Sequence, residues 1–176
     1  MTDAASWVER FSYFVVPVLR LPVPTEMDNP ACMTRPRAAR LRRYGRQLFP
    51  THSVAECCWH HQGDWHVVAE TAVRLVRRAQ GEGYEGARIG ERAMDIADDE
   101  GIDGWYLDAL MSLVEAGMAI QVHRDAAGER SYIDGRHRVT AMLDAGVRET
   151  VVARFDVHDP MSGRPLDPSE GWPPLA

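Results

Sequence analysis

The sequence predicts an α+β fold in which a helical N-terminal region packs on a small mixed β-sheet unit. Apolar residues recur at helical spacing from Trp65 to Val76, which indicates an amphipathic helix. After Gly117 the pattern changes to the alternation of a strand in 118–124, and a second strand follows at 130–134. With 176 residues, 45% apolar and 26% charged, the composition is that of an ordinary globular protein.

The N-terminal region is predicted to begin with a strand and a loop and to continue as helices. β-Branched and aromatic residues interrupted by prolines favour a short edge strand at 12–23, and three prolines favour a loop at 24–36. Helices are expected from 65 to about 78, around 87–99 after a glycine-rich turn at 81–86, and at about 104–116 with Gly117 as C-cap.

The C-terminal part is predicted to be a β-β-α-β unit. A hairpin of the strands 118–124 and 130–134 leads into a helix at 136–145, which Gly146 caps, and a strand at 149–157 closes the unit. The proline-rich residues 158–176 are not expected to form regular structure. We therefore divide the chain into a mainly helical region 1–103, a core 104–157 and a tail 158–176, packed as one compact domain.

Composition and charge restrict the compartment and the partners. No apolar stretch reaches the length of a membrane span, and the odd cysteine count (Cys32, Cys57, Cys58) favours a reducing cytoplasm. A net charge of -6 disfavours wholesale nucleic-acid binding. All 20 basic residues are arginine, which excludes a lysine-based phosphate loop and a Schiff-base lysine.

The segment Tyr132–Arg138 is the most informative, because it joins a predicted strand to a predicted helix. A helix start offers backbone N–H groups without a helical partner and a partial positive charge. Gly135 lets a phosphate approach the main chain, and Arg136, His137 and Arg138 add donors that Asp134 can orient. The pattern predicts an anion cradle; the alternative is that Asp134 caps the helix and the arginines are solvated.

Residues 106–155 resemble the ParB/sulfiredoxin superfamily. The resemblance is carried by the series WYLDALMSLVEAG, MAIQVHRD, RSYIDGRHRVTAMLDAG and ETVVARF, in which an Asp-Gly-x-His-Arg motif opens a helix. It implies a ParB/sulfiredoxin-like core that binds a nucleotide. It also implies phosphate contacts by Gly135, His137 and Arg138, with Asp134 and Arg136 beside them.

Departures from the superfamily narrow the expected activity. Sulfiredoxins carry a catalytic cysteine directly before the His-Arg pair, where this chain has Arg136, so reduction of cysteine sulfinate is not expected. Partition-type DNA clamps continue with a helix-turn-helix domain, whereas the proline-rich residues 158–176 follow here. A third branch phosphorylates free serine with an early-loop carboxylate as base, and Glu26 after the first strand is similar to it.

The expected function is therefore phosphoryl transfer to an unidentified small molecule, or hydrolysis of a nucleoside triphosphate. The cofactor would be ATP, ADP or CTP with Mg2+ held mainly by the nucleotide. Arg136 and Arg138 would neutralise the phosphoryl oxygens, His137 would donate a hydrogen bond, and Glu26 or a histidine of 52–66 would activate the acceptor. The alternatives are a non-catalytic ParB-like DNA-binding regulator with a nucleotide switch and, less favoured, a nuclease.

Two further clusters carry alternative interpretations. Arg40, Arg42, Arg43 and Arg46, in an arginine-rich run, are candidate nucleic-acid contacts, but a solvated helix face paired with acidic residues such as Glu100 is favoured. Cysteines and histidines gather at Cys57, Cys58, His60 and His61. Because adjacent cysteines do not easily point one way, we predict a buried, aromatic-rich loop packed under the Trp65 helix and assign no metal.

Overall fold

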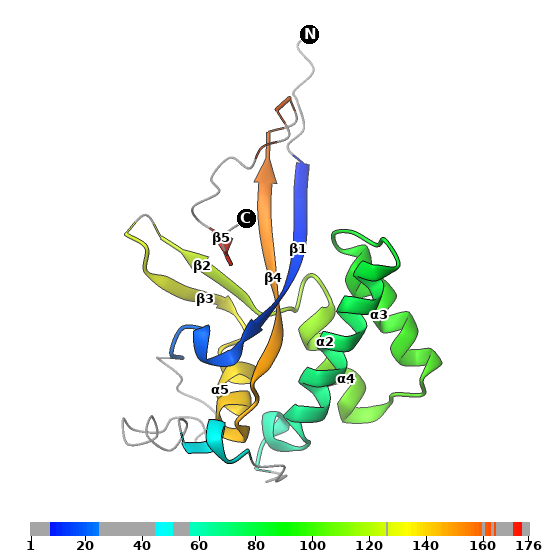
Figure 1. Cartoon of the computed structure of the whole chain (residues 1–176), viewed down its shortest axis with the longest axis vertical. Helices are drawn as coiled ribbons and strands as arrows, with labels where there is room; N and C mark the ends of the chain where they lie inside the picture. The colour runs from blue at the N-terminus through cyan, green and yellow to red at the C-terminus, as the bar shows by residue number, and fades with distance from the viewer. Residues whose placement is uncertain are drawn as a thin grey trace.

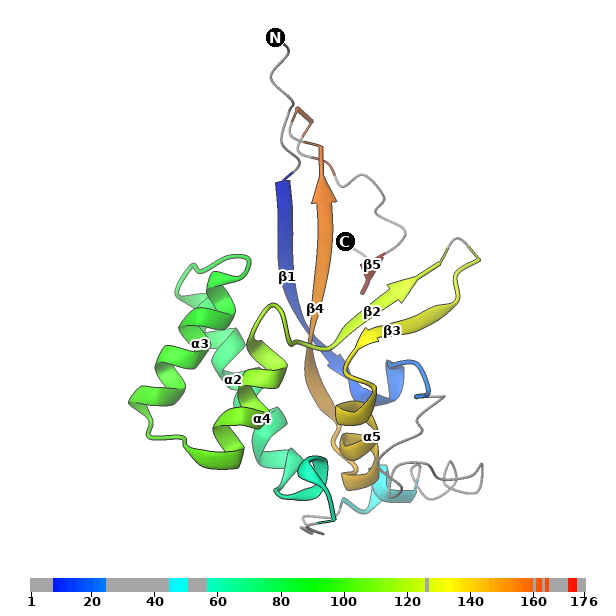
Figure 2. The same cartoon turned by 180° about the vertical axis from the view of Figure 1, so that it is seen from behind.

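The structure, a computed structural model, describes residues 8–24, 45–50, 57–125, 127–159, 161–162, 164 and 171–173. Within these residues the chain is mixed α+β with antiparallel sheets, which confirms the predicted fold class at that level. β1 (Val8–Pro17) pairs antiparallel with β4 (Glu149–His158) over the full length of both strands. This β1–β4 ladder runs between two groups of elements, as Figures 1 and 2 show from opposite sides.

The first group contains the three helices α2 (Trp65–Gly81), α3 (Arg88–Asp99) and α4 (Gly104–Val114). α2 packs against β4 and against both other helices. The apolar residues that recur at helical spacing in α2 are buried on one face of the helix. The side chain of its N-cap residue Asp64 accepts a hydrogen bond from the His66 N–H at 2.8 Å. The core is built from fully or almost fully buried side chains of these helices and of β4, among them Leu75, Val76, Leu110, Leu113, Val151 and Val152.

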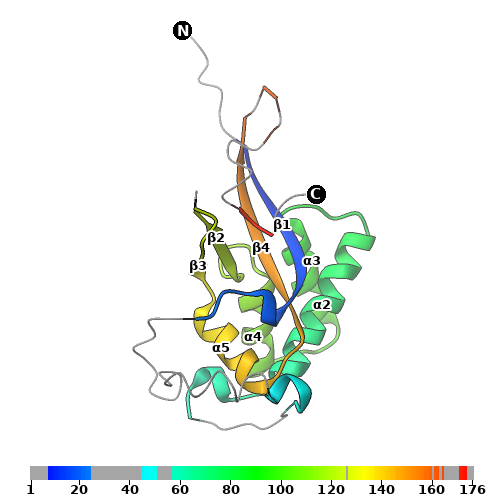
Figure 3. The same cartoon turned by 60° about the vertical axis from the view of Figure 1, so that its left-hand side comes forward.

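The second group contains a hairpin and one helix. β2 (Gln121–Arg124) pairs with β3 (Arg130–Asp134), and α5 (Arg136–Ala145) follows directly. The Ala153 N–H of β4 donates to the Ile120 carbonyl at 2.9 Å, which joins the base of the hairpin to the long ladder. Figure 3 shows α5 below the hairpin, where the short 3-10 helices η1 (Val18–Arg20) and η2 (Trp59–His61) pack against it. The predicted β-β-α-β order is confirmed.

Three of the element boundaries that differ from those predicted have a clear physical reason. The first strand ends at Pro17, which lacks an N–H for the ladder, and extends instead toward Val8. α4 ends at Val114 rather than near Gly117, because Glu115 has extended backbone angles and its carbonyl accepts from the Ala119 N–H at 2.8 Å. β2 begins only at Gln121 for the same reason, since this turn occupies the preceding residues.

The tail contains a strand that the sequence interpretation missed. β5 (Gly171–Trp172) pairs with the free edge of β2, and the Trp172 side chain is buried with the Arg130 guanidinium 5.5 Å from its ring centroid. The expectation that 158–176 lacks regular structure is therefore wrong at these two residues and at His158, the last residue of β4. Among the described residues, no helix is long and apolar enough to cross a membrane.

Candidate functional site

The β3–α5 junction is held in one conformation by Gly135. This residue has φ = 97°, the left-handed region that favours glycine, and an added Cβ would lie 2.7 Å from a side-chain carbon of Ile120. Asp134 Oδ1 accepts a hydrogen bond from the Gly135 N–H at 2.5 Å. Backbone conformation and packing on Ile120 therefore require glycine here, independently of any ligand.

α5 begins with residues rich in hydrogen-bond donors. Its first helical hydrogen bond runs from the Val139 N–H to the Gly135 carbonyl at 2.9 Å, so the amides of 136–138 precede the helical ladder. The helix dipole places partial positive charge at these amides. The Arg136 side chain is exposed and the His137 side chain is half-buried. An anion at this end of α5 would meet backbone donors and a cationic side chain together.

Arg138 has a different environment from Arg136. Its side chain is buried, and its guanidinium donates to the Ser112 and Met118 carbonyls and forms an ion pair with Asp134 at 2.9 Å. Burial lowers the pKa of Arg138, while the Asp134 carboxylate opposes that shift. Arg138 and Asp134 thus join the start of α5 to the end of α4. Their direct contact with phosphate stays a prediction.

His137 lies against a second histidine from a distant part of the chain. Its ring stacks on that of His60 with the centroids 5.3 Å apart and the planes 12° apart. Burial, followed by the charges of His137 and Arg138, lowers the pKa of His60 to about 4, so His60 is neutral at pH 7. His60 Nδ1 is buried and has no hydrogen-bond partner in the described part of the chain. The structure therefore brings the 57–61 segment to the predicted phosphate site.

Hydrogen bonds from two tryptophans hold the backbone of the 57–61 segment. The indole N–H of Trp65 donates to the His60 carbonyl at 2.6 Å, and that of Trp105 donates to the Trp59 carbonyl at 2.7 Å. The Trp65 and Trp105 rings meet edge to face with their centroids 5.5 Å apart. The predicted packing of an aromatic-rich loop at the Trp65 helix agrees with this arrangement, but the loop is not buried as predicted, because Cys57 and Trp59 are exposed.

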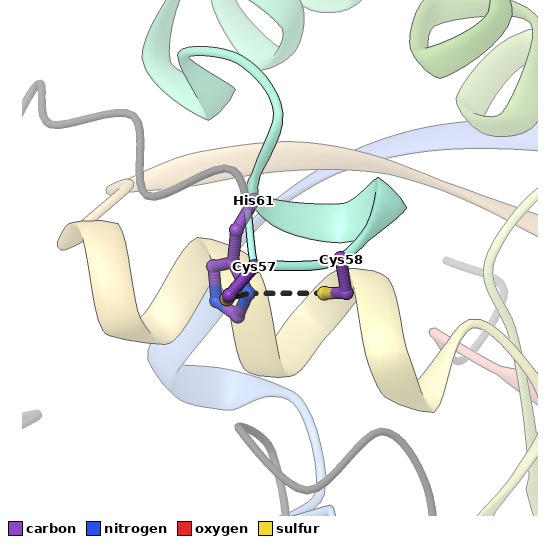
Figure 4. Close-up of side chains that lie close together, drawn as sticks. All are labelled: Cys57, Cys58 and His61. Carbon is purple, nitrogen blue, oxygen red and sulfur yellow. Dashed lines mark hydrogen bonds between the residues drawn. The ribbon is translucent and has the colours of Figure 1, made fainter.

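The same segment contradicts one step of the sequence interpretation. The thiols of Cys57 and Cys58 lie 3.3 and 3.2 Å from one atom, His61 Nδ1, so the adjacent cysteines do converge (Figure 4). The signal was present in the sequence, because Cys58 and His61 are separated by two residues, which is the spacing of common zinc-binding pairs.

Of the other predicted site residues, the structure describes only Arg46. Glu26, Arg40, Arg42 and Arg43 lie outside the described residues. Arg46 lies on a helical turn at 45–48 and donates to the Asp144 carbonyl near the C-terminal end of α5, opposite the predicted phosphate site. The acidic residue Glu100 pairs with Arg74 of α2 at 2.6 Å.

Two surface cavities lie on α2 and are separate from the β3–α5 junction. One, of about 360 Å3, lies between α2, α4 and the 100–103 turn, and the other, of about 1020 Å3, lies between α2 and residues 147–149. Residues 134–138 line neither of them. The chain matches no protein-family model, and comparison with curated proteins and with solved structures gave no significant match.

Proposed function

We propose that this protein binds a nucleoside di- or triphosphate at the start of α5 and transfers or hydrolyses its terminal phosphoryl group. The observation that carries the proposal is the Asp134–Gly135 corner, from which α5 starts with Arg136 and His137 in its first turn. A helix start of this kind stabilises phosphate through backbone amides and the helix dipole. The order helix, hairpin, helix, strand at 104–158 supports a core of ParB/sulfiredoxin-like type.

The geometry divides the roles among the five predicted residues. Arg136 is exposed and is proposed to neutralise phosphoryl oxygens directly, with His137 donating a hydrogen bond beside it. Arg138 is a positioning residue, because its guanidinium is bonded to the Ser112 and Met118 carbonyls and to Asp134. Gly135 provides the left-handed corner. Mg2+ would be bound mainly by the nucleotide phosphates.

Glu26 remains the proposed base that activates the acceptor. The histidines of the 52–66 segment are the other candidates, and among those that the structure describes His60 stacks on His137. A group with a pKa of about 4 is a weak base at neutral pH, about three units below the value at which a general base works best. His60 is therefore better suited to holding His137 than to accepting a proton.

Isothermal titration with ATP, ADP and CTP, each with and without Mg2+, tests the proposal. We expect one nucleotide per chain, and we expect Arg136→Gln to weaken binding by about 10-fold, the loss of one charge-assisted hydrogen bond. Arg77→Gln is the matched control, because Arg77 is also an exposed arginine but lies on α2. Its affinity should equal that of the wild type.

Two results would overturn the proposal. The first is that the wild type binds none of the three nucleotides under either condition. The second is that Arg136→Gln and Arg77→Gln bind equally well, which would show that the affinity arises from general positive charge and not from the start of α5.

A further inference from the structure

We propose that Cys57, Cys58 and His61 form a binding site for a thiophilic metal ion, with Zn2+ as the expected occupant. The Sγ atoms of Cys57 and Cys58 lie 3.3 and 3.2 Å from His61 Nδ1, and all three ligand atoms lie within 4.8 Å of one another. Figure 4 shows the three side chains gathered on one side of the η2 turn, in front of α5. This proposal does not depend on the proposed nucleotide binding.

The distances are close to those a tetrahedral zinc ion requires. With Zn–S of about 2.3 Å and Zn–N of about 2.0–2.1 Å, a tetrahedral site holds its sulfur and nitrogen ligands about 3.5 Å apart. The two sulfur–nitrogen distances here are shorter by only a few tenths of an ångström. The sulfur–sulfur distance is also within 4.8 Å, so all three ligand atoms are near the spacing of a tetrahedral site.

The backbone of the loop explains why two adjacent cysteines and one histidine converge. The His61 N–H donates to the Cys58 carbonyl at 2.9 Å, closing a tight turn that carries the His61 ring back to both thiols. Cys58 and His61 thus form a chelating pair with two residues between them. Cys57, four residues before His61, adds the third ligand.

The ligand loop is also held rigid by groups that do not themselves bind metal. Indole N–H groups from α2 and α4 hold the His60 and Trp59 carbonyls, as described above. Gly63 passes so close to Trp105 that an added Cβ would lie 2.2 Å from its ring. A loop fixed from two helices loses little conformational entropy when an ion binds, which is the usual requirement for a metal site.

The chemistry of the ligands selects the ion. Among the described residues the cluster offers two thiols and an imidazole, which are unsuited to Mg2+ or Ca2+, because these ions bind oxygen, and are typical ligands of Zn2+. The three ligands in the described part of the chain leave the fourth tetrahedral position for water or for another ligand. Cys57 is exposed, so the site is open to solvent on that side.

Titration of the reduced, metal-free full chain with Co2+, followed by displacement with Zn2+, tests the site. We expect one equivalent of Co2+ to produce thiolate-to-cobalt charge-transfer bands and the strong visible bands of tetrahedral cobalt, and Zn2+ to abolish both. Cys57→Ser, Cys58→Ser and His61→Gln should each weaken binding by more than the roughly 10–100-fold that loss of an outer hydrogen-bond partner costs. His123→Gln, a histidine on β2, is the matched control and should bind as the wild type does.

Three outcomes would overturn the proposal: no thiolate bands with the wild-type chain, equal binding by the ligand variants, or an equal loss in His123→Gln. A second measurement needs no variant. Zn2+ should slow the alkylation of Cys57 and Cys58 in the wild-type protein, as followed by peptide mass spectrometry, and unchanged alkylation rates would contradict a metal held by these thiols. Unchanged alkylation rates in the presence of Zn2+ are what a thiol pair that acts only in redox chemistry would give.

Discussion

Arg138 illustrates how one buried side chain can join two helices. The last carbonyls of a helix lack hydrogen-bond partners within the helix. Near the end of α4, two such carbonyls accept hydrogen bonds from residues far away in the sequence. Arg138 donates to the Ser112 carbonyl, and the Tyr13 hydroxyl donates to the Val114 carbonyl at 2.6 Å. Burial raises the pKa of the Tyr13 hydroxyl, so this donor stays protonated. The start of α5 is thereby tied to the end of α4.

Replacing Arg138 should therefore affect stability strongly. Arg138→Met keeps much of the side-chain volume but leaves the Ser112 and Met118 carbonyls without this donor and removes the partner of Asp134. We expect the free energy of unfolding to fall by about 3 kcal/mol, measured by urea denaturation. The exposed Arg77→Met should change it by less than about 0.5 kcal/mol. Similar losses in the two variants would show that Arg138 does not hold α4 and α5 together.

At the scale of elements, α3 lies close to the end of α4. Gly90 of α3 faces the Val114 carbonyl, and an added Cβ would lie 2.1 Å from that oxygen and 2.7 Å from the Tyr13 hydroxyl. Glycine at this position thus permits α3 to pack against the Val114 carbonyl, which also accepts the hydrogen bond from the Tyr13 hydroxyl.

Gly90→Ala should destabilise the protein by about 1–3 kcal/mol, because backbone and hydroxyl oxygens must move to admit the methyl group. Gly81→Ala is the matched control: Gly81 is the last residue of α2, and an added Cβ there would have no neighbouring atom within 4 Å. Alanine is the better helix former, so this control should be neutral or slightly stabilising. Thermal unfolding of both variants measures the difference, and equal effects would contradict the packing of α3 described here.

A second contact between elements should give a pH-dependent contribution to stability. Glu100, after α3, accepts two hydrogen bonds from Arg74 of α2 at 2.7 and 2.6 Å, and these bonds, helped by the charge of Arg74, hold its carboxyl pKa below the ordinary 4.5. A lowered folded-state pKa means that the stabilisation is present above the unfolded-state value and is lost as the pH falls through the folded-state value.

Glu100→Gln should accordingly lower the melting temperature at pH 7 relative to the wild type, and the difference should be smaller at an acid pH well below 4.5. Because the carboxylate is at the surface, the effect should be small and should decrease with added salt. A difference in melting temperature that is the same at both pH values would contradict a role for the Glu100 charge.

For the whole molecule, the elements with strong local signals were predictable and their long-range partners were not. α5 spans 136–145 with Gly146 as its left-handed cap, as predicted, because period, glycine and strand context agree. The pairing of β5 with β2 was missed, since a two-residue strand has no periodicity and depends on the burial of Trp172. Likewise no local pattern distinguishes Arg136, which is exposed, from Arg138, which is buried.

In the candidate site, too, the local features could be predicted from the sequence and the long-range contacts could not. The sequence indicated the Asp134–Gly135 corner and the cluster of cysteines and histidines, but their proximity depends on packing. The 57–61 segment reaches α5 because Trp65 and Trp105 hold it, and the stacking of His60 on His137 joins the two clusters. Thus the proposed metal and nucleotide sites are neighbours in space although about 75 residues separate them along the chain.

The central claim is that nucleotide phosphates bind at the start of α5, and amide chemical-shift mapping tests it most directly. A 176-residue chain of 19.8 kDa is accessible to two-dimensional nitrogen–proton NMR. Addition of ATP with Mg2+ should shift the amides of residues 135–138 most, and adenosine, which lacks phosphate, should leave them unchanged. Shifts confined to the α2 cavities, or equal shifts with adenosine, would contradict the claim.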